Sequence, residues 1–292
     1  MTDHTSPRPS TVRLQRMVRA YRESAALMAG VELGLFTRVA QGCDTQQALA
    51  KALRITPLHA ERIIGACVGL GLLQRDADKL SNAADVQRFL VEGEPQYAGE
   101  WMLFTKPDWN EWGQLSDYLR NLTPPRADNL KVCGFSVDDA RKYHRATYSI
   151  GRGAGRLFLR QVDLSAKRHM LDIGGGSGAY CIEACKAHPE LRATVLDLEP
   201  VAVVAREFIA EHGLSDRIEA LACDFNKDPF PVGADVAVMA SNLPMYGRDE
   251  FRAVVGKAFA ALAPGAQMHL IGEALNAQRT APVDAALWGL SE

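Results

Sequence analysis

A glycine-rich segment that follows a short apolar run is the part of this sequence best suited to chemistry. The apolar run His169–Ile173 carries one acid, Asp172, and leads into Gly174–Gly178, which reads GGGSG, and then into the helix-like stretch 179–187. A buried strand, a turn that needs glycine and a helix N-terminus together form a site for a nucleotide-like ligand. By itself this pattern fits NAD, FAD or another nucleoside-like cofactor.

Further acids narrow the choice of ligand. Asp197 ends the next apolar stretch, where a carboxylate can bind both ribose hydroxyls. Asp224 and Phe225 follow the third stretch, where an acid can accept from an adenine amine and a ring can cover the base. No Lys-Ser or Lys-Thr pair follows the glycines, which disfavours a triphosphate loop. Acids around the loop favour a ligand that is cationic or uncharged there, and S-adenosylmethionine carries a sulfonium and an ammonium.

Alternating strand and helix patterns are expected to position these residues. We predict that residues 164–292 form a doubly wound, Rossmann-like α/β domain with a mostly parallel sheet. The strands are predicted over 170–173, 193–198, 218–222, 234–240 and 268–271, with helices that include 201–212 and 249–262, the latter closed by Pro264-Gly265.

The first part of the chain has a different organisation. Residues 1–12 are polar, hold two prolines and are predicted to be a disordered tail. Over 13–95 we predict a winged-helix dimerisation domain, with a helix capped by Thr45, a second helix over 58–70 and a hairpin around Asp76-Ala77-Asp78. The second helix offers only Arg62 as a cation, so we expect no nucleic-acid partner.

Thr11 to Ala40 is predicted to be one long helix with a break near Gly30 or Gly34. Its segment ALMAGVELGLFTRV is apolar on nearly every side. Such a helix either makes a dimer contact or is buried in its own domain, and the pattern leaves both open.

Residues 96–163 are predicted to be a helical linker or substrate lid, rich in aromatic side chains. Within it we expect 138–148, DDARKYHRATY, to line the substrate site, although a solvated helix face would also explain its charges. The predicted substrate contacts in this region are Trp101, Arg141, Tyr143, Arg145 and Tyr148.

The composition of the chain argues against several other classes of protein. At 292 residues the chain is long enough for two domains, and its net charge of -2 gives no general attraction to nucleic acid or anionic membranes. No apolar run approaches a membrane span and no signal peptide is visible. The 6 cysteines form no CxxC pair and no zinc pattern. We therefore expect reduced thiols, no metal, no membrane partner and a cytoplasmic protein.

Four segments in order, LDIGGGSGAY, VLDLEPV, ACDFNKDPFP and SNLPMYGRDEF, resemble class I S-adenosylmethionine-dependent methyltransferases. More narrowly, residues 15 to 290 resemble the small-molecule O-methyltransferases of the caffeate type, which occur in plants and bacteria. The resemblance implies S-adenosylmethionine as cofactor and a homodimer formed through the N-terminal helices. The cofactor contacts that it implies are Asp172, Gly174 and Gly176 at the methionine end, Asp197 and Leu198 at the ribose, Asp224 and Phe225 at the adenine, and Asn242.

One departure from that family concerns the general base. The family reads approximately S-N-x-L-H-x-W-x-D-E after the fourth strand, with its His as the base, and Met245 occupies that position here. Methionine cannot take a proton, whereas a hydroxyl acceptor must lose one. Tyr143 or His144 could supply the base, the protein could be a non-catalytic binding protein, or the acceptor could need no base. Tyr246 is a predicted substrate contact in the same segment.

The base-free alternative favours a thioether sulfur as acceptor. Bacterial S-methyltransferases of the same superfamily act on 4-methylthio-2-hydroxybutyrate, on the route to dimethylsulfoniopropionate, and a thioether acid of this kind is the favoured expectation. O-methylation of a phenolic, polyketide or carotenoid-type hydroxyl is the alternative.

The second departure is at the end of the sequence. Methyltransferases of this class usually finish with an antiparallel hairpin after the fifth strand, but only residues 275–292 remain here. The expectation is a sheet without that hairpin, in a chain that is a fragment or a truncated product.

Overall fold

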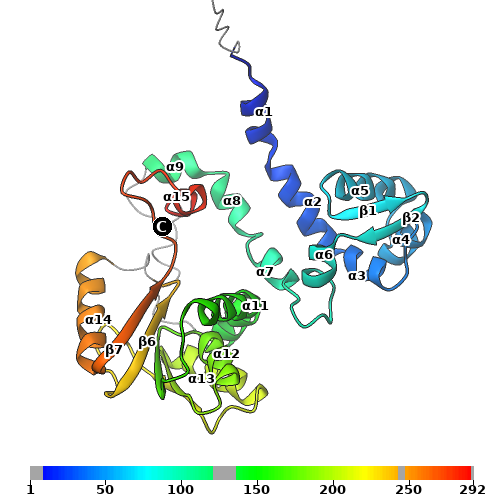
Figure 1. Cartoon of the computed structure of the whole chain (residues 1–292). Coiled ribbons are helices and arrows are strands. Elements are labelled where there is room, and N and C mark those ends of the chain that lie inside the picture. The colour runs from blue at the N-terminus through cyan, green and yellow to red at the C-terminus, as the bar shows by residue number, and fades with distance from the viewer. Residues whose placement is uncertain (1–8, 121–135, 243–246, 291–292) are drawn as a thin grey trace, which may run out of the picture. The chain divides into compact units, whose positions relative to one another are not determined.

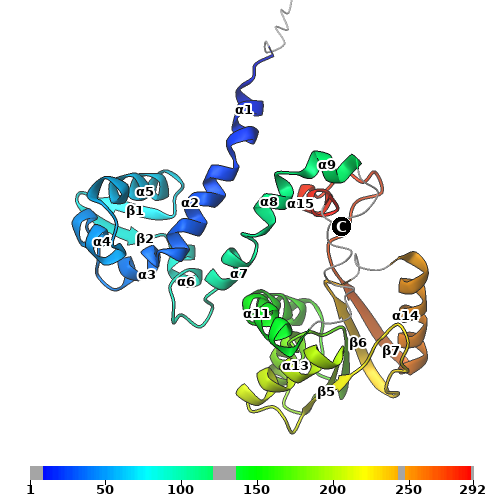
Figure 2. The ribbon, with the colours of Figure 1, turned by 180° about the vertical axis from the view of Figure 1, so that it is seen from behind.

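The computed structural model describes residues 9–120, 136–242 and 247–290. The chain divides into two compact units, Met1–Pro107 and Asp108–Glu292. Figure 1 and Figure 2 show the elements of each unit from opposite sides. The predicted linker 96–163 is divided between the units, because its first helix packs in one and its long helix packs in the other.

The first unit is a set of short helices around a two-stranded hairpin. Its elements are α1 (Val12–Arg19), α2 (Tyr21–Glu32), α3 (Leu35–Ala40), α4 (Gln46–Leu53), α5 (Pro57–Gly69), β1 (Leu73–Asp76), β2 (Lys79–Asn82), α6 (Ala84–Phe89) and α7 (Gly99–Phe104). The predicted winged helix is confirmed. The Thr45 hydroxyl caps α4 by accepting from Ala48 N at 3.3 Å, and the antiparallel strands β1 and β2 pair Asp76 with Lys79.

Two breaks interrupt the long N-terminal helix. Gly34 has a φ of 67°, a left-handed conformation that favours glycine, and it separates α2 from α3 as predicted. The break at Ala20, between α1 and α2, was not predicted. Gly30 has another role, because a Cβ at this position would lie 2.8 Å from the ring of Phe36 on α3. This glycine therefore permits the close contact between α2 and α3.

The second unit is an α/β domain. Its elements are α8 (Asp108–Trp112), α9 (Leu115–Arg120), α11 (Val137–Gln161), β3 (His169–Ile173), α12 (Ala179–Ala187), β4 (Arg192–Asp197), α13 (Glu199–Glu211), β5 (Ile218–Ala222), β6 (Ala234–Ala240), α14 (Arg248–Ala261), β7 (Leu262–Ile271) and α15 (Val283–Trp288). All neighbouring strands are parallel, in the order β5-β4-β3-β6-β7. The predicted doubly wound fold is confirmed.

The central strands β4, β3 and β6 are buried on both faces, because successive side chains point to opposite faces and helices pack on each. Met170, Val195 and Val238 pack in one cluster with residues of α11, α12 and α13. Their neighbours Leu171, Leu196 and Met239 pack in the other cluster with residues of α14. In Figures 1 and 2, α11 to α13 accordingly lie on one side of the sheet and α14 on the other.

The chain proceeds from β3 toward one edge of the sheet and from β6 toward the other. The carboxyl ends of β3 and β6 therefore flank the point where the strand order reverses, which is where doubly wound sheets bind ligands. This switch point places the GGGSG loop, which follows β3, beside the segment that follows β6.

The last strand differs from its prediction. We expected a turn at Pro264-Gly265 and a strand over 268–271, but β7 begins at Leu262 and includes both residues. Gly265 has a φ of 79°, and the pairing with β6 shifts its register between Ala234 and Val236. This irregularity and the edge position make the proline tolerable in a strand. Within the described ranges, no helix is long and apolar enough to span a membrane.

Candidate cofactor site

The loop between β3 and α12 is a turn that depends on glycine. Gly174, Gly176 and Gly178 have φ values of 67°, 57° and 72°, in the left-handed region that L side chains rarely adopt. The amides of Gly174 and Gly175 donate to the Leu196 carbonyl, at 2.8 and 3.3 Å. These bonds tie the loop to the end of β4, so the backbone of the site is defined by two neighbouring strands.

Side chains press against the loop at places where a Cβ would not fit. A Cβ on Gly174 would lie 2.1 Å from Asn242 Nδ2, and one on Gly175 would lie 2.6 Å from Asp172 Cγ. A Cβ on Gly176 would lie 2.7 Å from the His144 ring. The sequence predicts Gly174 and Gly176 as cofactor contacts but not Gly175. The contact between Gly175 and Asp172 depends on the direction of the Asp172 side chain, which the sequence pattern does not show.

Asp172 is a buried acid, and its side chain is 1% exposed. The Cys181 thiol donates to its Oδ2 at 3.5 Å. Burial, with a smaller contribution from the nearby charge of Asp197, raises the pKa of Asp172 to about 7, against the opposing effect of the thiol. A cationic ligand would relieve this unfavourable burial.

Asp197 at the end of β4 accepts a backbone hydrogen bond on each carboxylate oxygen, one of them from the loop. Gly176 N donates to Oδ2 at 2.9 Å and Leu198 N donates to Oδ1 at 2.8 Å. Burial nevertheless raises the pKa of Asp197 to about 6, because it outweighs the two backbone hydrogen bonds. A carboxylate has about four acceptor positions, so two remain for the hydroxyls of a ribose.

The segment after β5 supplies Asp224 and Phe225. Asp224 Oδ2 pairs with Lys227 Nζ at 2.7 Å and its Oδ1 accepts from Asn226 N at 3.1 Å. The Lys227 ammonium lowers the pKa of Asp224, so this acid is ionised at neutral pH. Phe225 is 6% exposed and lies near Gly174, since a Cβ there would be 3.4 Å from its ring. The site therefore has an apolar surface beside the loop.

The order of these residues follows the order of the strands. Asp224 follows β5, Asp197 ends β4, the loop follows β3 and Asn242 follows β6, and these strands are consecutive in the sheet. Strand spacing of about 4.8 Å gives the row a length of about 14 Å. Such a row fits an elongated ligand with an adenine, a ribose and an amino-acid end, as in S-adenosylmethionine.

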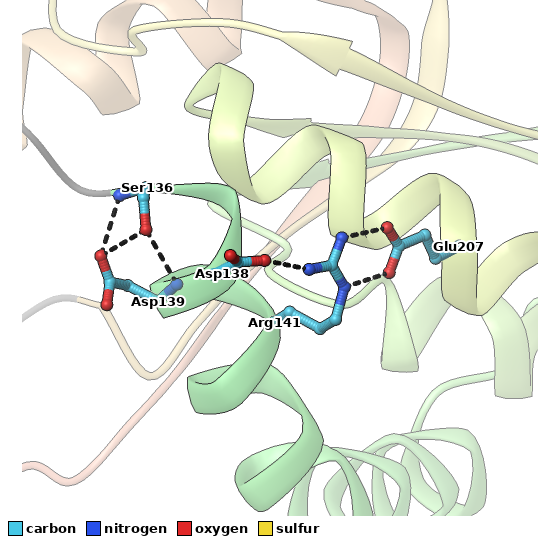
Figure 3. A network of polar contacts seen from close by, with 5 residues as sticks. All are labelled: Ser136, Asp138, Asp139, Arg141 and Glu207. Carbon is cyan, nitrogen blue, oxygen red and sulfur yellow. Dashed lines mark hydrogen bonds and ion pairs between the residues drawn. The ribbon is translucent and has the colours of Figure 1, made fainter.

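The predicted acceptor residues on α11 are mostly engaged with α13. Arg141 donates to both carboxylate oxygens of Glu207, at 2.9 and 2.7 Å, and Figure 3 shows this pair beside the capping box of Ser136 and Asp139. Arg145 pairs with Glu211 at 3.1 Å. These contacts favour a structural role, and their assignment to substrate stays a prediction. Glu207 and Glu211 were missed, although their spacing matches that of Arg141 and Arg145.

Tyr148 also contacts α13. Its hydroxyl lies 3.1 Å from His212 Nε2, and its ring centroid lies 4.3 Å from that of Phe208. His144 differs from these neighbours because its ring packs against Gly176 of the loop and against Tyr143, with ring centroids 5.0 Å apart. Of the predicted catalytic residues that the structure describes, His144 is therefore the one in contact with the glycine loop.

The remaining predicted residues lie in the first unit, next to Asp197 or outside the described ranges. Trp101 lies on α7 in the first unit, where its ring stacks on Phe104 with centroids 5.9 Å apart. Leu198 lies next to Asp197 with 44% of its side chain exposed. Met245 and Tyr246 fall outside the described residues. Among the described side chains, no group of three or more His, Cys, Asp or Glu is arranged to hold a metal ion.

The raised pKa values predict how stability changes with pH. The folded protein holds protons on Asp172 and Asp197 more tightly than the unfolded chain does, so these groups make the cofactor-free protein less stable as pH rises from about 4 to 7. We expect Asp172→Asn to flatten this slope and to raise the melting temperature near pH 7.5. Thermal unfolding of both proteins across this range tests the expectation. A variant that is less stable than the parent at pH 7.5 would contradict it.

Comparisons with known proteins show both the fold and the family of this chain. The structure of human N-acetylserotonin methyltransferase in complex with S-adenosylmethionine matches with a TM-score of 0.83 at 23% identity, over 99% of this chain and 87% of that one. The fold is thus that of S-adenosylmethionine-dependent methyltransferases. An O-methyltransferase domain model matches residues 130–291, and an O-methyltransferase dimerisation domain model matches residues 15–91. The chain belongs to the O-methyltransferase family.

Individual relatives have several kinds of acceptor in their names. The 3-hydroxy-5-methyl-1-naphthoate 3-O-methyltransferase of Streptomyces sahachiroi is 32% identical over 276 residues, which are 92% of this chain and 79% of that protein. The N,N-dimethyltransferase OxyT of Streptomyces rimosus is 30% identical, over 86% of this chain and 75% of that protein. The protein is therefore a methyltransferase that uses S-adenosylmethionine, as the sequence motifs predicted.

Proposed function

We propose that this enzyme transfers the methyl group of S-adenosylmethionine to a hydroxyl group on an aromatic small molecule. The observation that carries the proposal is the 32% identity, over 92% of this chain, to an enzyme whose name specifies a hydroxynaphthoate and its 3-oxygen. The bound cofactor supplies an electrophilic methyl group on a sulfonium. The residues that we propose to hold it are the row from Asp224 through Asp197 and the glycine loop to Asn242.

The predicted thioether acceptor is the weaker proposal. It rested on Met245 in place of a general base and on the cations of α11 as partners for a carboxylate. Arg141 and Arg145 are paired with Glu207 and Glu211, which leaves less support for that carboxylate site. None of the named relatives compared above carries a thioether in its name.

A panel of acceptors tests the proposal. The enzyme would be incubated with methyl-labelled S-adenosylmethionine and, separately, with hydroxynaphthoates, simple phenols, aromatic amines and 4-methylthio-2-hydroxybutyrate. Methyl transfer to the hydroxynaphthoates is the expected result. Transfer to the thioether or to the amines alone would overturn the hydroxyl assignment while leaving the methyltransferase class intact.

The absence of a histidine at position 245 raises the question of how the hydroxyl loses its proton. Burial lowers the pKa of His144 to about 4, so its imidazole is neutral at pH 7 but weakly basic. A phenol with a pKa of about 10 would transfer its proton to such a base at a cost of about 8 kcal/mol. We therefore propose that the acceptor reacts as an anion formed in solution, and that His144 contacts the bound ligands without taking the proton.

This proposal predicts the dependence of rate on pH. We expect kcat/KM for a phenolic acceptor to rise about tenfold per pH unit until the pKa of that acceptor is reached. His144→Gln should keep this slope and lower kcat/KM by less than about tenfold, whereas loss of a general base costs about 10² to 10⁴. A flat profile in the parent below the pKa of the acceptor, together with a loss in the larger range for the variant, would instead make His144 the base.

We further propose that the protein is a homodimer formed through its N-terminal helices, as the dimerisation-domain match supports. Leu14, Met17, Val18 and Tyr21 are spaced as one helical stripe, and each side chain is more than half exposed. Burial of this stripe against a second copy would remove exposed apolar surface from water. The predicted cytoplasmic location stays a prediction.

Charge substitutions in the stripe are expected to separate the dimer. Met17→Glu with Val18→Glu places two carboxylates in the proposed contact, so sedimentation should show monomers where the parent shows dimers. Arg16→Glu makes the same change of net charge on the opposite face of α1 and should leave the dimer intact. If the double variant stays dimeric, α1 does not form the contact.

A further inference from the structure

Asn242, two residues after the end of β6, carries a buried acceptor that no described residue uses. The residue is 9% exposed, and its Oδ1 is buried with no hydrogen-bond partner among the described residues. Leaving a buried acceptor unpaired costs about 1 to 3 kcal/mol. An unpaired group of this kind at the edge of a ligand site requires an explanation, and a donor on the ligand is one.

The orientation of the carboxamide is determined by its other end. Asn242 Nδ2 donates to the Ile173 carbonyl at 3.0 Å, so the nitrogen and the oxygen cannot be exchanged without losing this bond. Gly174 makes the bond possible, because a Cβ at that position would lie 2.1 Å from Nδ2. The bridge from β6 to β3 therefore holds Oδ1 in place beside the glycine loop.

The position of Asn242 along the sheet limits which donor it can meet. Asp224 and Asp197 follow β5 and β4, whereas Asn242 follows β6, on the other side of β3. With the adenine at β5 and the ribose at β4, the amino-acid end of the cofactor reaches the loop and β6. The adenine amine and the ribose hydroxyls are thus placed away from Asn242, and the α-ammonium is the remaining cofactor donor.

We propose that Asn242 Oδ1 accepts a hydrogen bond from the α-ammonium of S-adenosylmethionine and so selects ligands with that amine. The Ile173 carbonyl accepts from Nδ2, and the carboxamide oxygen beside it is an acceptor that no described residue uses. Hydrogen bonds to charged groups are stronger than neutral ones, about 1.5 to 3 kcal/mol. Asn242 thereby acts as a specificity residue for the cofactor.

Calorimetry with a pair of ligands tests this inference without any methyl acceptor, so its failure is distinct from failure of the proposed O-methylation. The ligands are S-adenosylhomocysteine and its analogue with hydrogen in place of the α-amino group. The parent protein is expected to bind the amine-containing ligand at least about tenfold more tightly. Asn242→Ala should reduce this preference to below about threefold, chiefly by weakening the binding of S-adenosylhomocysteine.

A control variant separates this contact from a general loss of the site. Asp224→Asn changes the predicted adenine end, so it should weaken both ligands by the same factor and preserve the preference for the amine. Asn242→Ser fills more of the buried space than alanine but does not reach the position of Oδ1, so it should lower the preference in the same way. This second variant carries the test if Asn242→Ala does not fold.

Several results would overturn the inference. A preference that is unchanged in Asn242→Ala would mean that the residue only bridges β6 and β3. Unchanged binding of both ligands, with a raised KM for the methyl acceptor, would assign Oδ1 to that acceptor instead. A parent protein that does not distinguish the two ligands, or an Asn242→Ser variant that keeps the preference, would also exclude the proposed contact.

Discussion

Replacing Asp197 with alanine is expected to weaken binding of S-adenosylmethionine by about a hundredfold or more. The proposed hydrogen bonds from the two ribose hydroxyls to this carboxylate would be lost, and each such bond to a charged group contributes about 1.5 to 3 kcal/mol. The substitution also removes the acceptor of Gly176 N and so loosens the loop. Calorimetric titration with S-adenosylhomocysteine measures the effect.

Two further variants show whether the loss of binding is specific to the carboxylate at position 197. Asp216→Ala removes an exposed carboxylate just before β5, at the edge of the sheet opposite the site, and should leave binding unchanged. Asp197→Asn keeps the shape but removes the buried charge and sets an NH2 group against one of the two backbone N–H donors, so it should bind the cofactor weakly. Binding of the alanine variant within about threefold of the parent would refute the ribose assignment.

Substitution of Gly174 by alanine is expected to destabilise the second unit and abolish cofactor binding. Its φ of 67° costs an L residue about 1 to 2 kcal/mol, and overpacking against Asn242 adds about 1 to 3 kcal/mol. The sum is a large part of a typical folding free energy of about 5 to 15 kcal/mol. Thermal unfolding should show a fall of about 10 °C.

Gly213 provides a matched control for this substitution. Its φ is 65°, but a Cβ there would meet no atom within 4 Å, so Gly213→Ala carries only the conformational cost. The difference between the two variants therefore measures the contact between residue 174 and Asn242. Equal losses of stability, with cofactor binding retained in both, would show that the Asn242 bridge to Ile173 is not needed.

Much of the fold could be predicted because its signals are local. The strands β5 and β6 have the predicted bounds, since apolar runs between turn signals define buried parallel strands. The beginning of β7 was predicted six residues too late because Pro264 and Gly265 usually mark a turn. Their inclusion in the strand depends on the register shift against β6, which is a property of the pair and not of either sequence.

The residues of the site could be predicted where the order of the strands brings them together. They were harder to predict where the direction of a side chain decides its contacts. Parallel strands bring Asp172, Asp197 and Asp224 to one edge, so their spacing in the sequence was informative. The partners of α11 could not be predicted from sequence spacing, because side chains of this one helix point in different directions. Arg141 contacts Glu207, whereas His144 contacts Gly176. Helical spacing identified these residues as a group, but packing against α13 separates their roles.

Identifying the atom that receives the methyl group is the most direct test of the proposed function. The enzyme would be supplied with carbon-13 methyl-labelled S-adenosylmethionine and an equimolar mixture of a hydroxynaphthoate and 4-methylthio-2-hydroxybutyrate, and the product would be examined by carbon NMR. The expected result is one labelled signal in the region of aromatic methoxy groups. A labelled signal from a methylsulfonium, with none from a methoxy group, would contradict the proposed hydroxyl acceptor.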